Sequence, residues 1–182
     1  MADRYTEVVI LCEDLTHLNF VRRYLIHRGV HARRIRANMS PSGRGAGTQH
    51  VIENYPLEVK ALRSRSYLRA GLVTVVDADN SSVEERLRQL ENSLVQHGQP
   101  GRGATERIAS LSPKRNVETW VFRLLGNPAG EEDDYKKQAL PSDIKVAVAA
   151  FADVCPRKAG GIDLPSLRHA CNELTTFLAR GI

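Results

Sequence analysis

Residues 72–80 read Leu-Val-Thr-Val-Val-Asp-Ala-Asp-Asn, an apolar and β-branched run that changes abruptly to carboxylates. The run is almost entirely apolar, without regular alternation, which is typical of a strand buried on both faces of a sheet. Residues 7–12, Glu-Val-Val-Ile-Leu-Cys, repeat this pattern and are followed at once by Glu13 and Asp14. The two runs therefore predict two interior strands of one sheet, each ending in acidic residues.

Segments with helical spacing follow both runs. Residues 15–27 predict a helix that stops before Gly29, and Ser82 with Glu85 forms the capping-box pattern of another helix. We also expect strands at residues 30–37 and 107–111 and helices at residues 50–64, 116–125, 142–154 and 165–179, with Pro56 starting or kinking its helix. The alternation predicts an α/β fold with a largely parallel sheet flanked by helices and a C-terminal helical pair.

The composition indicates a globular protein, since 42% of the 182 residues are hydrophobic and 26% are charged. We expect residues 1–126 to form the α/β domain and residues 127–182 a C-terminal helical extension packed on it. No apolar run approaches the roughly 20 residues that cross a bilayer, and the first residues lack a secretory signal, so we expect a cytoplasmic protein without membrane contact. Cys12, Cys155 and Cys171 are expected to be reduced core thiols.

Glu13, Asp77 and Asp79 are the candidate catalytic residues and metal ligands. In open α/β sheets the ligand crevice lies outside the carboxyl ends of the strands, so these acids are expected to converge there. Converging carboxylates repel one another unless a cation joins them, and oxygen ligands suit Mg²⁺ or Mn²⁺ better than zinc. The alternative is that both acidic segments merely form turns and helix N-caps, which also favour Asp, Asn and Glu.

The strand that ends at Glu13, the helix after it and the segment Val75-Val-Asp77-Ala-Asp79-Asn80 resemble the Toprim domain. This domain is the metal-binding α/β module of topoisomerases, bacterial primases and overcoming-lysogenization-defect nucleases. Residues 116–120, Asn-Val-Glu-Thr-Trp, are similar to the Glu-x-Trp element of small stand-alone Toprim-like proteins associated with phage defence. The resemblance covers residues 6–125 and implies that Glu13 binds metal or transfers a proton, and that Asp77 and Asp79 are metal ligands.

Two positions near this motif set have alternative interpretations. Asp14 stands where the family commonly has glycine, and there it would crowd a substrate phosphate or add a ligand. Glu118 lies in the first turn of its predicted helix, where it is either a further metal ligand or a capping residue. Trp120 is expected in the core rather than as a platform for stacking bases.

The net charge of +5 is compatible with an acidic partner such as nucleic acid. Several basic residues are candidates for phosphate contacts and are expected to border the acidic pocket, with solvated loop residues as the alternative: Arg34, Arg36, Arg44, Lys114 and Arg115. His17 and His50 are candidates for proton transfer, and an ordinary surface position is the alternative for each.

These features together predict a Mg²⁺- or Mn²⁺-dependent nuclease that hydrolyses phosphodiester bonds in DNA or RNA. The resemblance adds a role as an antiviral defence effector with an ATPase partner protein, and the C-terminal helices could provide a homodimer face. The alternative from another class is a non-catalytic Toprim-like module that senses nucleic acid or a partner protein. A receiver domain is disfavoured by the long separation between Glu13 and Asp77.

Overall fold

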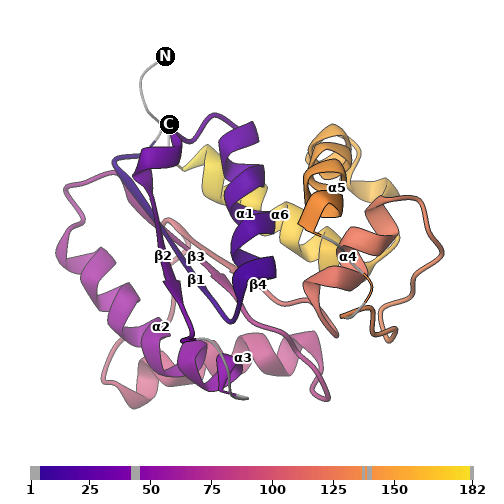
Figure 1. Cartoon of the computed structure of the whole chain (residues 1–182). Coiled ribbons are helices and arrows are strands. Elements are labelled where there is room, and N and C mark those ends of the chain that lie inside the picture. Colours follow the sequence, from indigo (N-terminus) through magenta and orange to yellow (C-terminus); the bar gives the residue numbers. More distant parts are fainter. Residues whose placement is uncertain (1–4, 42–45, 137, 139–140, 181–182) are drawn as a thin grey trace.

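The fold is taken from a computed structural model that describes residues 5–41, 46–136, 138 and 141–180. Among these residues, four parallel strands form one sheet in the order β2-β1-β3-β4 (Figure 1). The strands are β1 (Glu7–Cys12), β2 (Ile35–Met39), β3 (Ala70–Val75) and β4 (Ile108–Leu111). The helices are α1 (Leu15–His27), α2 (Gly47–Ser64), α3 (Val83–Gln96), α4 (Val117–Leu124), α5 (Pro141–Val154) and α6 (Pro165–Ala179). The predicted α/β class, with a parallel sheet and C-terminal helices, is confirmed.

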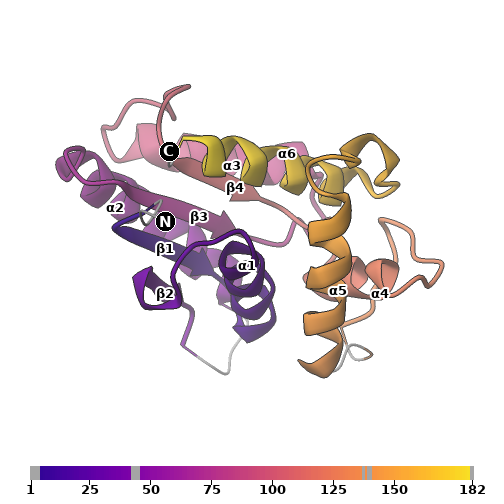
Figure 2. The same cartoon turned by 90° about the horizontal axis from the view of Figure 1, so that it is seen from above.

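The helices cover the two faces of the sheet in separate layers. Alternate residues of β1 point to opposite faces, because side chains along a strand have a period of two. Val8 and Ile10 enter the core shared with α1, α4, α5 and α6, whereas Val9 enters the core shared with α2 and α3. Trp120 lies in the first of these cores, as expected, and its indole N–H donates to Ser166 Oγ at 2.8 Å. Figures 1 and 2 show α1 and α5 side by side on this face.

Two predicted boundaries differ from the structure. Strand β2 begins at Ile35 rather than near residue 30, because residues 32–34 form a 3-10 turn in which the His31 side chain accepts from Arg33 N–H. Helix α2 begins at Gly47 and contains Pro56 in its interior, on the face that is buried. The capping box of α3 is confirmed, since Ser82 and Glu85 exchange side-chain and backbone hydrogen bonds.

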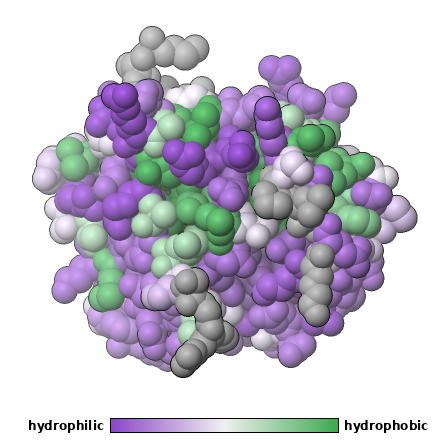
Figure 3. Space-filling model, viewed as in Figure 1, coloured by the Kyte–Doolittle hydropathy of each residue, from purple (hydrophilic) through white to green (hydrophobic). Residues whose placement is uncertain are grey.

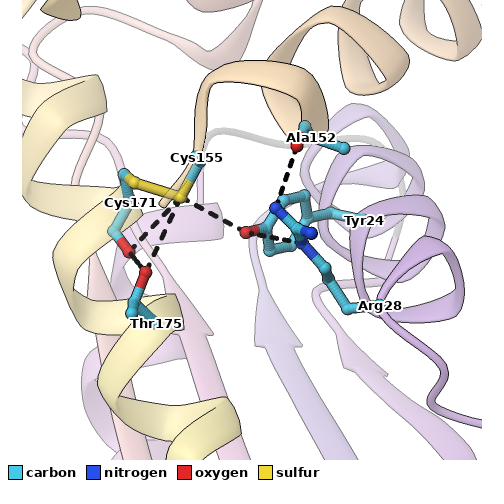
Figure 4. The surroundings of a disulfide bond; sticks show 6 residues. All are labelled: Tyr24, Arg28, Ala152, Cys155, Cys171 and Thr175. Atoms are coloured by element: carbon cyan, nitrogen blue, oxygen red, sulfur yellow. Dashed lines mark hydrogen bonds between the residues drawn. A yellow bond between two sulfur atoms is a disulfide. The ribbon is translucent and has the colours of Figure 1, made fainter. Parts of the chain in front are cut away.

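The expectation that all three cysteines are reduced thiols is wrong for two of them. Cys155 and Cys171 form a disulfide with their Cα atoms 5.7 Å apart, while Cys12 is free and buried (Figure 4). Cys155 follows α5 and Cys171 lies within α6, so only the packing of these helices brings the two sulfur atoms together. Beside the disulfide, Arg28 donates to Ala152 O at 2.9 Å, which joins α1 to α5.

The surface of the described residues is mainly polar on the face seen in Figure 3, most uniformly over the lower half, where α2 and α3 lie. Apolar residues gather in the upper half of that view, separated by hydrophilic ones. Large exposed apolar side chains such as Leu15 and Val146 come from different helices. No helix among the described residues is long and apolar enough to span a bilayer.

Candidate functional site

Glu13 and Asp77 meet at the carboxyl edge of the sheet. Strands β1 and β3 are hydrogen-bonded neighbours in register, with Cys12 opposite Val75, so the residues that follow them leave the sheet side by side. The backbone N–H of Asp77 donates to Glu13 Oε1 at 2.8 Å, and Thr48 Oγ1 donates to the same oxygen at 3.2 Å. The start of α2 presses against the other side of this carboxylate, because a Cβ atom on Gly47 would lie 2.8 Å from Glu13 Oε2.

His17 is a buried partner of Asp77, so the surface position weighed for it is wrong. Its side chain is 1% exposed, and its Nε2 lies 2.9 Å from Asp77 Oδ1. Burial alone would lower the pKa of His17, but the charge and hydrogen bond of Asp77 outweigh it and raise that pKa to about 9. His17 is therefore an imidazolium that offsets acidic charge at neutral pH.

Asp14 positions His17 by starting α1. Its Oδ1 accepts hydrogen bonds from the backbone N–H groups of Thr16 and His17, at 2.9 and 3.0 Å, which is the N-cap arrangement. His17 Nδ1 lies 4.0 Å from the same oxygen and has no hydrogen-bond partner among the described residues. The capping interpretation thus holds for Asp14, whereas Glu13 bonds across the sheet edge.

Glu118 lies in the first turn of α4 but does not cap that helix, since Asn116 Oδ1 accepts from Thr119 N–H instead. The Glu118 side chain is buried. Burial raises its pKa, and the negative charges of Asp14 and Asp77 raise it further. Glu118 therefore belongs electrostatically to the same cluster as the acids that follow β1 and β3.

Asp79 lies at the solvent side of this cluster. Its φ of 53° is in the left-handed region, which Asp tolerates better than most residues, and it turns the chain away from β3. The side chain is exposed, and its charge raises the pKa of Asp77. Asp79 is thus close enough to influence Asp77 but is open to solvent.

The carboxylates at this edge repel one another, and this repulsion adds to the effect of burial on their pKa values. Burial raises the pKa of Glu13, and the charge of Asp77 raises it further; burial also raises the pKa of Asp77, against the effect of His17. Lys136, in the loop before α5, faces this charge: burial opposes its protonation, but Asp77, Asp14 and other acids raise its pKa. No sequence signal marked Lys136, because the loop that carries it has no helical or strand periodicity.

The donor chemistry suits a hard divalent cation, because buried carboxylates with raised pKa values gain most from a positive charge. Their present arrangement does not form a ready site: within the described ranges, no three His, Cys, Asp or Glu side chains are placed so that they could hold a metal ion. Asp77 is paired with His17, and Glu13 Oε1 is occupied by two donors. A cation at Asp77 Oδ1 would therefore compete with His17 for that oxygen.

Two of the predicted phosphate-binding residues lie beside the acidic turn. Lys114 Nζ donates to Asp79 O at 3.1 Å, and Arg115 donates to Asn80 Oδ1 at 3.3 Å. Both also lie near the carboxylate of Glu132, at 3.2 and 3.8 Å. These contacts hold the two cations at the rim of the candidate site.

The other predicted basic residues are placed elsewhere. Arg36 lies on β2 and pairs with Glu58 at 3.0 Å and with Glu7 at 3.5 Å, toward the amino end of β1. Arg34 lies in the 3-10 turn before β2, and Arg44 falls outside the described residues. His50 is half-buried on α2 and its Nε2 contacts Asn38 Oδ1 at 3.0 Å. The structure does not bring Arg36 to the acidic cluster.

Comparisons of the chain with models of known protein families, with curated proteins and with solved structures found no match. The resemblance to the Toprim domain therefore depends on the motifs quoted above. What the structure adds to it is an α/β domain whose four-stranded, all-parallel sheet has the order β2-β1-β3-β4.

Proposed function

We propose that the protein is a divalent-metal-dependent nuclease with a Toprim-like domain, which hydrolyses phosphodiester bonds of DNA or RNA. The observation that carries the proposal is the hydrogen bond from Asp77 N–H to Glu13 Oε1, because it joins the acidic ends of two interior strands. A buried group whose pKa is shifted by burial and by a specific charged neighbour is a candidate functional residue. Glu13 and Asp77 both meet this description.

In this proposal, Glu13, Asp77, Asp79 and Glu118 would hold Mg²⁺ or Mn²⁺. The ion would neutralise phosphate charge and lower the pKa of a bound water. Oε2 of Glu13 accepts no hydrogen bond from the described residues and is the oxygen suited to take a proton from the attacking water. Lys114 and Arg115 at the rim would bind phosphate oxygens, and His17 would hold the Asp77 carboxylate in place.

The test is the double variant Asp77→Asn with Asp79→Asn, which keeps side-chain size and removes two negative charges. Cleavage of single-stranded DNA, double-stranded DNA and RNA is measured with Mg²⁺ or Mn²⁺, and Mn²⁺ binding is measured separately by electron paramagnetic resonance. We expect cleavage to fall by orders of magnitude and Mn²⁺ binding to weaken, while thermal melts remain cooperative. Equal cleavage by wild type and variant would contradict the proposal.

A second candidate is a non-catalytic Toprim-like module that binds nucleic acid or a partner protein. It is favoured by the charge balance of the site, where His17 already neutralises Asp77 and no preformed set of three ligands is present among the described residues. Under this alternative, wild type binds oligonucleotides but releases no cleavage product with either metal. The same assays therefore separate the two candidates.

The biological setting remains part of the proposal. An antiviral defence role, an ATPase partner, a homodimer and a cytoplasmic location all derive from the sequence and the resemblance. Disulfides are uncommon in reducing compartments, so the Cys155–Cys171 bond bears on the location. The state of this bond in the cell is tested by alkylating the protein during isolation and counting its free thiols. One free thiol indicates that the disulfide is present, and three indicate the reduced form.

A further inference from the structure

A groove of about 330 Å³ runs between α1 and α5, outside the acidic site. Helix α1 contributes residues spaced at i, i+3, i+4, i+7 and i+8, which share one face of a helix. Residues of α5 form the opposite wall, and the described residues that line the groove are Asn19, Arg22, Arg23, Ile26, His27, Lys145, Val148 and Ala149. Among these described lining residues, Arg22, Arg23, His27 and Lys145 carry basic or titratable nitrogen atoms, and none carries a carboxylate.

Three cations of this groove do not stabilise the fold through polar contacts with the described residues. Arg22, Arg23 and Lys145 make no hydrogen bond or ion pair with any residue that the structure describes, although they share one groove. Most arginines elsewhere are engaged by the protein; Arg63 and Arg102, for example, bind the carboxylates of Glu106 and Glu173. Unpaired like charges that share a groove repel one another, and a polyanion would remove this repulsion.

A structural explanation accounts for only part of this charge. Cations near the carboxyl end of a helix are favoured by its dipole, which suits His27 in the last turn of α1. Lys145 lies near the amino end of α5, where the dipole does not favour a cation. Arg28, by contrast, has a structural role, because it donates a hydrogen bond to Ala152 O and so links the end of α1 to α5.

We propose that the groove between α1 and α5 binds the phosphate backbone of a nucleic-acid strand, with Arg22, Arg23 and Lys145 as its phosphate contacts. The choice of nucleic acid among polyanions rests on the proposed nuclease function. Helix α1 begins beside the acidic site (Figure 1), and the groove lies farther along the same helix. At 1.5 Å and about 100° per residue, Arg22 lies about 7.5 Å along the axis and about 140° around it from His17, so a strand that reaches both the acidic site and the groove has to pass around the start of α1.

The test uses the full chain and a fluorescently labelled 20-nucleotide single strand, as DNA and as RNA, in EDTA. The groove variant combines Arg22→Gln, Arg23→Gln and Lys145→Gln. A matched control combines Lys60→Gln, Arg69→Gln and Arg88→Gln, which removes the same charge from exposed cations of α2, α3 and the turn before β3. We expect the groove variant to bind at least tenfold more weakly and its salt slope to fall by about 2, since each phosphate contact on a single strand contributes about 0.7. The control should bind like wild type.

Three results would overturn the proposal. Equal loss in both triple variants would indicate a general charge effect, and unchanged binding by the groove variant would place the strand elsewhere. Groove-dependent binding of vesicles rich in phosphatidylserine, without binding of either oligonucleotide, would assign the groove to a membrane surface. A variant with Arg22→Lys and Arg23→Lys retains the charge and should retain binding. Retained binding would show that the groove variant binds weakly because it lacks the charges, and not because substitution at these positions disrupts the fold.

The experiment also separates this inference from the nuclease proposal. Because EDTA removes divalent metal, groove-dependent binding would stand even if wild type shows no cleavage. The converse result is also possible. If Asp77→Asn loses cleavage, while the groove variant keeps both cleavage and oligonucleotide binding, the nuclease proposal is supported and the groove proposal is overturned. Asp77→Asn is expected to bind the oligonucleotide as well as wild type does.

Discussion

Strand β1 begins at Glu7 and is followed directly by Glu13, and these two glutamates have different surroundings. Glu7, at the amino end, pairs with Arg65 at 2.9 Å and with Arg36 at 3.5 Å, and its side chain is 29% exposed. Glu13, at the carboxyl end, faces Asp77 across the sheet edge and has no arginine or lysine within ion-pair distance among the described residues. One end is neutralised by surface ion pairs, while the other concentrates buried negative charge.

The charge at the amino end of β1 is thus balanced by arginines, whereas the charge of Glu13 lies beside a second carboxylate. The ion pairs of Glu7 stabilise its ionised form. Burial and neighbouring carboxylates instead raise the pKa values of Glu13 and Asp77, which means that they disfavour the ionised forms of these two residues. Within the described ranges, the cation in ion-pair contact with Asp77 is His17, whose side chain is 1% exposed. Functional sites commonly keep unfavourable electrostatic interactions of this kind, and the protein is less stable as a result.

The largest expected effect comes from Glu13→Gln, compared with Glu7→Gln. Loss of the Glu13 carboxylate should reduce metal-dependent cleavage by about a thousandfold, because it removes the group that binds the metal or accepts the proton of the attacking water. Glu7→Gln should leave cleavage little changed. Single-turnover cleavage of a labelled strand measures both. Equal effects of the two substitutions would remove the functional difference between the ends of β1.

The next effect is on stability and compares the cations at the two ends. His17→Ala leaves the Asp77 carboxylate buried without its partner and should lower the free energy of unfolding by about 3 kcal/mol. Arg65→Ala removes a partly exposed ion pair at the surface and should lower the free energy of unfolding by less than about 1 kcal/mol. Urea unfolding at pH 7 in EDTA measures both variants. A smaller loss for His17→Ala than for Arg65→Ala would contradict the assignment of His17 as a buried counter-ion.

The stability should also depend on pH through His17. Burial opposes the charge of His17, but Asp77 outweighs it and raises the folded pKa to about 9, against about 6.5 in an unfolded chain. The contribution is therefore fully present below about pH 6.5 and is lost as the pH rises through about 9. Between about pH 7 and pH 8.5 the free energy of unfolding should fall by about 2 kcal/mol. Urea titrations should show a flatter profile for His17→Gln; the same slope in both would contradict the prediction.

The smallest effect tests the packing of α2 against Glu13. A Cβ atom at Gly47 would lie 2.8 Å from Glu13 Cβ and Oε2, so Gly47→Ala should displace the carboxylate and lower the free energy of unfolding by about 1 kcal/mol. Gly160→Ala is the control, because nothing lies within 4 Å of the added atom. Thermal melts with parallel cleavage assays compare the two. A stabilised and fully active Gly47→Ala would show that Glu13 is not held by this contact.

Much of the fold was predictable because its signals are local. The apolar runs at residues 7–12 and 72–76, the helical spacing of residues 15–27 and the capping box at Ser82 each depend on neighbouring residues, and each matches an observed element within about two residues. The start of β2 was predicted too early, because the competing 3-10 turn at residues 32–34 depends on the His31 side chain.

The candidate site was predictable where a residue directly follows a buried strand, as Glu13 and Asp77 do. The burial of His17 was not predictable, because the sequence around a histidine in the first turn of a helix does not show which residues will pack over it. Lys136 and the Cys155–Cys171 pair were missed because long-range packing, rather than local pattern, brings their partners near.

The sequence by itself determined the class of fold, the two acidic strand ends and the capping box of α3, because period, turn chemistry and hydrogen bonds within a few residues specify them. Tertiary structure alone decided that Glu13 accepts from Asp77 N–H, that His17 neutralises Asp77, and that α1 and α5 enclose a basic groove. Each of these depends on the order of strands and the packing of helices far apart in the chain, which no local pattern encodes.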